Sequence, residues 1–120
     1  MMRRSVALFV FLAGLAFAAP AWAHAHLVTA DPAVGSTVDP TDTLRLTFSE
    51  GIEITFSKVE VTKSDGMNVA PAKVALDPAD AKVVVVTFPA MLGAGGYKVH
   101  WHVVSVDTHH TEGTFEFAVK

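Results

Sequence analysis

Residues 44–49 have the sequence LRLTFS, in which leucine, leucine and phenylalanine alternate with arginine, threonine and serine. Successive side chains of a β-strand point to opposite faces, so this period of two predicts a strand with one buried face. The same alternation occurs further along the chain, at 58–62 and at 114–119. These three segments predict a fold built from half-buried strands.

Four more segments are predicted as strands. Residues 83–88, VVVVTF, are largely apolar and β-branched at both odd and even positions, which predicts a central strand covered on both faces. Residues 95–105 follow a glycine-rich turn and predict a long strand, and shorter strands are expected near 26–30 and 67–76. No segment of residues 24–120 shows helical periodicity. We therefore expect an all-β domain, a seven-stranded antiparallel Greek-key β-sandwich or barrel.

The first 23 residues have a different character. The uncharged run SVALFVFLAGLAFAA at 5–19 follows Arg3 and Arg4 and precedes Ala21-Trp22-Ala23. This pattern is typical of a secretory signal peptide that is cleaved after Ala23. The run is shorter than the roughly 20 residues of a membrane-spanning helix, which argues against a membrane span. A retained membrane anchor is the alternative interpretation. We expect residues 1–23 to be a cleaved signal peptide and residues 24–120 to form one domain, not embedded in the membrane once mature.

Charge and composition exclude several classes of function. Removal of Arg3 and Arg4 leaves seven basic residues against twelve acidic ones, so the mature protein is acidic. Affinity for nucleic acid depends on basic side chains that neutralise phosphates. A protein with more acidic than basic residues lacks this source of affinity, so we exclude nucleic-acid binding. The chain contains no cysteine, which excludes disulfides, thiolate zinc sites, iron–sulfur clusters and a cysteine nucleophile. A metal site would have to use nitrogen, oxygen or methionine ligands.

The six histidines lie at the two ends of the mature segment, namely at His24, His26, His100, His102, His109 and His110. The first strand of a sandwich can lie beside late strands, so the pattern permits one joint site. After cleavage, His24 would offer an α-amine and an imidazole to one ion. Asp107 and His109 would share a face if their segment is extended. Such nitrogen and oxygen ligands suit Cu(II), with zinc and nickel as competitors.

Five motifs in this order resemble the CopC family of periplasmic copper-binding proteins: His24-Ala25-His26-Leu27, the Pro32/Gly35 turn, LTFSE at 46–50, GYKVHW at 96–101 and SVDTH at 105–109. The resemblance covers nearly all of residues 24–120. It implies a small cupredoxin-like or immunoglobulin-like β-sandwich that binds one Cu(II) ion. It also implies a periplasmic location and an inner-membrane copper transporter of the CopD type as a partner.

The resemblance also implies the ligands. By position, His24, Asp107 and His109 would hold the Cu(II) ion, and Glu50 would orient the amine or an imidazole. Some family members bind Cu(I) through a methionine-rich loop that contains histidine. After residue 23 this chain has only Met67 and Met91, with no histidine near either in the sequence. We therefore expect the Cu(I) site to be absent.

Two histidine groups have other interpretations. A histidine at the third position of a free terminus can bind Cu(II) together with the amine and two deprotonated amides. His26 could form this rival site without Asp107 and His109, or it could assist the first site. His100 and His102 alternate with Trp101 and are predicted to be exposed polar residues on the opposite face of the strand from it.

Three classes of function remain. The leading hypothesis is a copper carrier or buffer in copper homeostasis or resistance, which is not an enzyme. A copper-dependent oxidative enzyme is the alternative, because an N-terminal histidine chelate also holds copper in polysaccharide-cleaving enzymes. The single tyrosine and the single tryptophan after residue 23 argue against a broad aromatic substrate face. The third class is a structural adhesion domain whose histidines have no common role.

Overall fold

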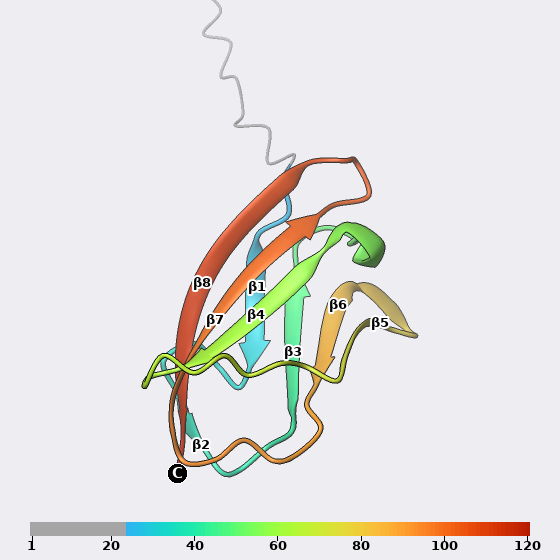
Figure 1. Ribbon diagram of the computed structural model, residues 1–120. Coiled ribbons are helices and arrows are strands. Elements are labelled where there is room, and N and C mark those ends of the chain that lie inside the picture. The colour runs from blue at the N-terminus through green and yellow to red at the C-terminus, as the bar shows by residue number, and fades with distance from the viewer. Residues whose placement is uncertain (1–23) are drawn as a thin grey trace, which may run out of the picture.

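The computed structural model describes residues 24–120, and the predicted signal peptide at 1–23 lies outside the described residues. The first sheet contains, in spatial order, β1 (Leu27–Asp31), β3 (Thr43–Phe48), β6 (Asp80–Thr87) and β5 (Lys73–Asp77). The second sheet contains β2 (Thr37–Val38), β8 (His110–Val119), β7 (Gly95–Val104) and β4 (Lys58–Lys63). A short 3-10 turn, η1 (Ile54–Phe56), precedes β4. Figure 1 shows β4 and β7 crossing in front of β1, with β6 and β5 to the right of this crossing.

The predicted all-β sandwich is confirmed, with two differences in its strands. The strand expected near residues 67–76 is β5, which begins only at Lys73, and one strand is additional. The described chain has eight strands rather than seven, because residues 37–38 form the short strand β2. This strand pairs parallel with the end of β8, whereas the other strand pairs are antiparallel. Two residues are too few to show a period of two, so the sequence pattern carries no signal for β2.

Alternating apolar residues form the core, as predicted. Leu44 and Leu46 of β3 are fully buried, and Val84 and Val86 are fully buried in β6. The order of the first sheet places β6 between β3 and β5, which confirms a central strand, but its outward face is not fully covered, because Val85 is only partly buried. The other buried apolar side chains of the described chain include Phe48, Val59, Val61, Val99, Val103, Phe115 and Phe117. The core therefore lies between the two sheets.

The start of the described chain is fixed to both sheets. Ala25 is buried, and its carbonyl accepts a hydrogen bond from the Thr111 hydroxyl of β8 at 2.7 Å. The His26 N–H donates to Ser49 Oγ at 3.0 Å, and the Ser49 N–H donates to the His26 carbonyl at 2.9 Å. Figure 1 shows this segment at the end of the sandwich where the β7–β8 turn lies. The fold thus places the first histidines beside the turn that contains Asp107 and His109.

Residues 24–120 contain no helix that is long and apolar enough to cross a bilayer.

Candidate metal centre

A tight turn between β7 and β8 positions two of the predicted ligands. The Thr108 N–H donates to the Ser105 carbonyl at 2.8 Å, and the Ser105 N–H donates to the His109 carbonyl at 3.0 Å. Thr108 has φ 71°, a left-handed conformation that a β-branched residue adopts only under local constraint. The segment therefore turns, whereas the sequence interpretation assumed an extended one. Asp107 and His109 still meet, because the turn folds their side chains together.

His109 is the centre of the contacts among the three predicted ligands. Its Nδ1 lies 3.1 Å from Oδ2 of Asp107. Its ring centroid lies 4.6 Å from that of His24, with an angle of 86° between the ring planes. The structure thus brings His24, Asp107 and His109 together from the two ends of the described chain. The side chains of Asp107 and His109 are partly exposed, so an ion can reach them from solvent.

Ser105 orients the Asp107 carboxylate. Ser105 is fully buried, and its hydroxyl donates a hydrogen bond to Oδ1 of Asp107. Hydrogen bonds from Ser105 and then from His109 lower the pKa of Asp107 below its ordinary value. The carboxylate therefore stays ionised, with one oxygen held by Ser105 and the other facing His109. This role of Ser105 was not predicted from the sequence, because the hydrogen bond depends on the turn geometry at Thr108.

Glu50 and His26 lie near the turn but differ in their contacts. Glu50 is partly buried directly after β3. The next residue, Gly51, accepts a hydrogen bond from the Val106 N–H at 2.9 Å, which joins the Glu50 segment to the β7–β8 turn. Within the described residues, Glu50 makes no hydrogen bond or ion pair with His24, Asp107 or His109. The His26 side chain is exposed, and its backbone is bonded to Ser49.

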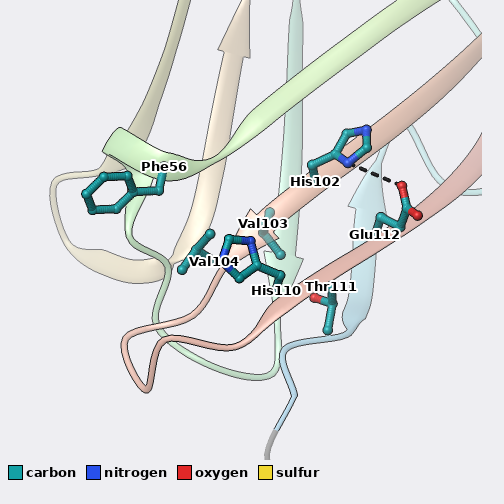
Figure 2. A pocket seen from close by; sticks show the side chains of 7 residues that line it. All are labelled: Phe56, His102, Val103, Val104, His110, Thr111 and Glu112. Carbon is teal, nitrogen blue, oxygen red and sulfur yellow. Dashed lines mark ion pairs between the residues drawn. The ribbon is translucent and has the colours of Figure 1, made fainter.

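The remaining histidines lie on the outer face of the second sheet. His100 and His102 are partly exposed on β7 and flank the buried Trp101, as predicted. Their imidazoles contact carboxylates of neighbouring strands, which the sequence analysis did not anticipate. His110 begins β8 and lines a surface pocket of about 340 Å³ with His102 and Glu112 (Figure 2).

Met67 and Met91 lie at one surface hollow. Both side chains are exposed, and both line a pocket of about 400 Å³ that also contains Phe88 and Tyr97. No histidine is among the described residues that line this pocket.

Comparison with known proteins places this geometry in a family. Residues 27–120 match the CopC domain. The chain is 39% identical to Copper resistance protein C of Xanthomonas campestris pv. juglandis, over 98% of this chain and 97% of the relative. It is 38% identical to Copper resistance protein C of Pseudomonas syringae pv. tomato, over 100% and 99% of the two chains. It is also 41% identical to protein YobA of Escherichia coli K12, over 82% and 81%.

Solved structures agree with these relatives. The crystal structure of PcoC, a methionine-rich copper resistance protein from Escherichia coli, has a TM-score of 0.75 and 36% sequence identity, and the match covers 81% of this chain and 99% of PcoC. CopC from Methylosinus trichosporium OB3b has a TM-score of 0.74 and 28% identity, over 81% of this chain and 94% of that one. In sequence, fold and domain extent, the chain belongs to the CopC family.

Proposed function

We propose that this protein is a periplasmic Cu(II)-binding protein that carries or buffers one copper ion in copper homeostasis or resistance. Membership of the CopC family and the names of the relatives, copper resistance proteins, support the copper function. The observation that carries the proposal is the contact of the His24 ring with the His109 ring, beside the Asp107 carboxylate. The α-amine needed for the site would become available when the signal peptide at 1–23 is removed after Ala23.

The ligand set follows from these contacts. His24 would supply its imidazole and its α-amine, His109 an imidazole, and Asp107 a carboxylate oxygen. Nitrogen and oxygen donors of this kind suit Cu(II), which also binds near the top of the divalent affinity order, ahead of zinc and nickel. An aspartate is already deprotonated at neutral pH, and the lowered pKa of Asp107 keeps this ligand ionised further into the acidic range. Glu50 would act from outside the ligand set, by orienting the amine or an imidazole.

The backbone contacts of residues 24–26 favour this folded site over the rival chelate centred on His26. That chelate needs the amide nitrogens of residues 25 and 26 as metal ligands. The His26 amide instead donates to Ser49 Oγ, and Ala25 is buried with its carbonyl bonded to Thr111. Formation of the chelate would break the hydrogen bond to Ser49 and pull Ala25 out of the core.

A carrier is favoured over an oxidative enzyme by the positions of the aromatic residues. Tyr97 and Trp101, the only tyrosine and the only tryptophan in residues 24–120, are buried between the sheets. Neither can form the aromatic face on which a polysaccharide would stack. The proposed Asp107 ligand would also fill a position that oxygen chemistry needs open. A copper transporter of the CopD type in the inner membrane is the partner that we propose for this carrier.

The methionine content supports a carrier of Cu(II) without the Cu(I) site of methionine-rich relatives. PcoC is described as methionine-rich. In contrast, residues 24–120 of this chain contain two methionines, and no histidine lines the pocket that they share. Ligation of Cu(I) by thioethers normally needs several sulfur atoms.

Electron paramagnetic resonance of the exported protein, loaded with one equivalent of Cu(II), tests this proposal. The wild type should give a single axial spectrum with nitrogen hyperfine structure. The substitutions His24→Ala and His109→Ala should each change that spectrum and release copper to a mild competitor. His110→Ala is the matched control, because His110 is the neighbour of His109 and lies outside the proposed ligand set. Identical spectra for wild type, His24→Ala and His109→Ala would refute the proposed site.

A further inference from the structure

A second group of metal-binding side chains lies on the outer face of the second sheet. His100 and His102 are two residues apart on β7, on either side of the inward-facing Trp101. The strand register places Glu60 of β4 opposite His100, and Glu112 of β8 opposite His102. Three adjacent strands therefore present two imidazoles and two carboxylates on one face, which we call the outer cluster.

The side chains of the outer cluster are in mutual contact. Oε2 of Glu112 lies 3.1 Å from Nε2 of His100 and 3.2 Å from Nδ1 of His102. Nδ1 of His100 lies 3.9 Å from Oε2 of Glu60, and the two imidazole centroids are 4.2 Å apart. Figure 2 shows His102 and Glu112 pointing toward each other from neighbouring strands. One carboxylate oxygen thus faces both imidazoles.

These distances are close to those of a coordination sphere. Zn–N and Zn–O bonds of about 2.0–2.1 Å in a tetrahedron place neighbouring donor atoms about 3.3 Å apart. The contacts of Glu112 with the two histidines, at 3.1 and 3.2 Å, already have nearly this spacing. Potential ligand atoms of Glu60, His100 and His102 also lie within 4.8 Å of one another. An imidazole gives one ion one nitrogen, so an ion that shares Glu112 with His102 would use Nε2 of His100, and Nδ1 of His100 would keep facing Glu60.

We propose that the outer cluster is a second metal site, which binds a divalent transition-metal ion such as Zn²⁺ or Cu²⁺ through His100, His102 and Glu112, while Glu60 orients the His100 imidazole from its other nitrogen. Two imidazoles and carboxylate oxygens are the donors that these ions share. The site is separate from the His24 and His109 pair, and it does not depend on the function proposed above.

The outer cluster should bind more weakly than the first site. Its four side chains are all substantially exposed, between 38% and 63%. Oε1 of Glu60 lies 3.5 Å from the Lys58 ammonium, which competes with His100 for this carboxylate. Among residues 24–120, no buried hydroxyl orients the Glu60 or Glu112 carboxylate in the way that Ser105 orients Asp107. A site of this kind would exchange metal with the surroundings and fill after the first site.

Titration of the exported protein with Zn²⁺, followed by nuclear magnetic resonance of the histidine side chains, tests the proposal. The imidazole nitrogens of His100 and His102 should shift together and reach saturation as one ion per chain enters the outer cluster, after a first ion has filled the His24 and His109 site. His102→Gln and Glu112→Gln should each weaken this binding at least tenfold. His110→Gln is the matched control, because His110 lines the same pocket on β8 and lies outside the cluster. It should leave the titration unchanged.

Three outcomes would overturn the outer site. The His100 and His102 resonances could fail to saturate, the His102→Gln protein could bind Zn²⁺ like wild type, or sedimentation could show that Zn²⁺ joins two chains at this face. A parallel titration with Cu²⁺ distinguishes a lack of binding at the outer cluster from a lack of binding at the His24 and His109 site. His109→Ala removes copper only from the first site, whereas His102→Gln removes it only from the outer cluster.

Discussion

Ser105 connects the fold to the chemistry of the proposed copper site. It is the buried polar residue of the described core, and its hydroxyl holds one oxygen of Asp107 while the other oxygen faces His109. A partner that fixes the orientation of a metal ligand contributes to affinity without touching the metal. Ser105 is therefore a positioning residue for Asp107.

Ser105→Ala should weaken Cu(II) binding by roughly 10–100-fold, as is typical when a partner of a metal ligand is lost. It should also raise the pKa of Asp107, because the largest cause of its lowering is the Ser105 hydrogen bond. Competition with a chromophoric chelator measures the affinity, and nuclear magnetic resonance of the metal-free protein measures the pKa. Ser57→Ala is the control, since Ser57 accepts the Val104 N–H at the end of β7 and makes no hydrogen bond to Asp107. Equal losses of affinity in the two variants would show that Ser105 acts only on stability.

Among the elements of the first sheet, an ion pair joins the inner strand β3 to the edge strand β5 across β6. Arg45 of β3 lies 2.7 Å from Asp77 at the end of β5, on either side of β6. The hydrogen bond from Arg45 lowers the pKa of Asp77, and a backbone hydrogen bond from Ala79 adds to this effect. Because the pKa is lower in the folded protein, the pair stabilises the fold above the unfolded pKa of about 3.9. That stability is lost as the pH falls through the lower folded pKa.

Asp77→Asn should therefore lower the melting temperature slightly at pH 6, and the difference from wild type should vanish near pH 2. Asparagine can still accept the hydrogen bond from the Ala79 N–H, so the substitution measures the effect of removing the negative charge alone. Thermal melts followed by circular dichroism measure the effect. Asp80→Asn is the matched control, because Asp80 accepts the Lys82 N–H in the same hairpin. If the effect of Asp77→Asn were the same at both pH values, the ion pair would contribute nothing.

Strands and site differ in how far the sequence could predict them. The period of two identified β3, β4 and β8, because each buries one face, whereas the continuous apolar run identified β6 and the preceding glycine-rich turn indicated β7. These patterns carried no information on β2, which has two residues, or on the turn at Thr108. The approach of His24 to His109 could be expected only from family resemblance, since local patterns do not determine which strands are neighbours. The contacts of Glu60 and Glu112 with His100 and His102 depend on strand register, which the sequence pattern alone does not define.

At the scale of the whole molecule, processing at the N-terminus and folding act on the same site. Ala25 is buried and His26 is bonded to Ser49, so the fold holds the proposed first residue beside the β7–β8 turn. The α-amine of His24 would exist only when the preceding residues are removed. Copper binding would therefore be restricted to the exported, processed form.

A protein that retains Ala23 before His24 should bind Cu(II) much more weakly than one that begins at His24. The loss should exceed the roughly 10–100-fold that follows removal of an outer hydrogen-bond partner, because a direct ligand disappears. Mass spectrometry confirms the two termini, and competition with a chelator compares the affinities. Equal affinities would show that the α-amine is not a ligand.

The central claim is that the folded site, and not a flexible terminus, holds the copper ion. The most direct measurement is the Cu(II) affinity of His26→Ala, Asp107→Ala and His109→Ala against one competitor at one pH. We expect the largest loss of affinity for His109→Ala and near wild-type affinity for His26→Ala. Asp107→Ala should cause a smaller loss than His109→Ala, because a single carboxylate oxygen is a weaker Cu(II) ligand than imidazole. Loss of binding in His26→Ala, with wild-type affinity in the other two variants, would contradict it.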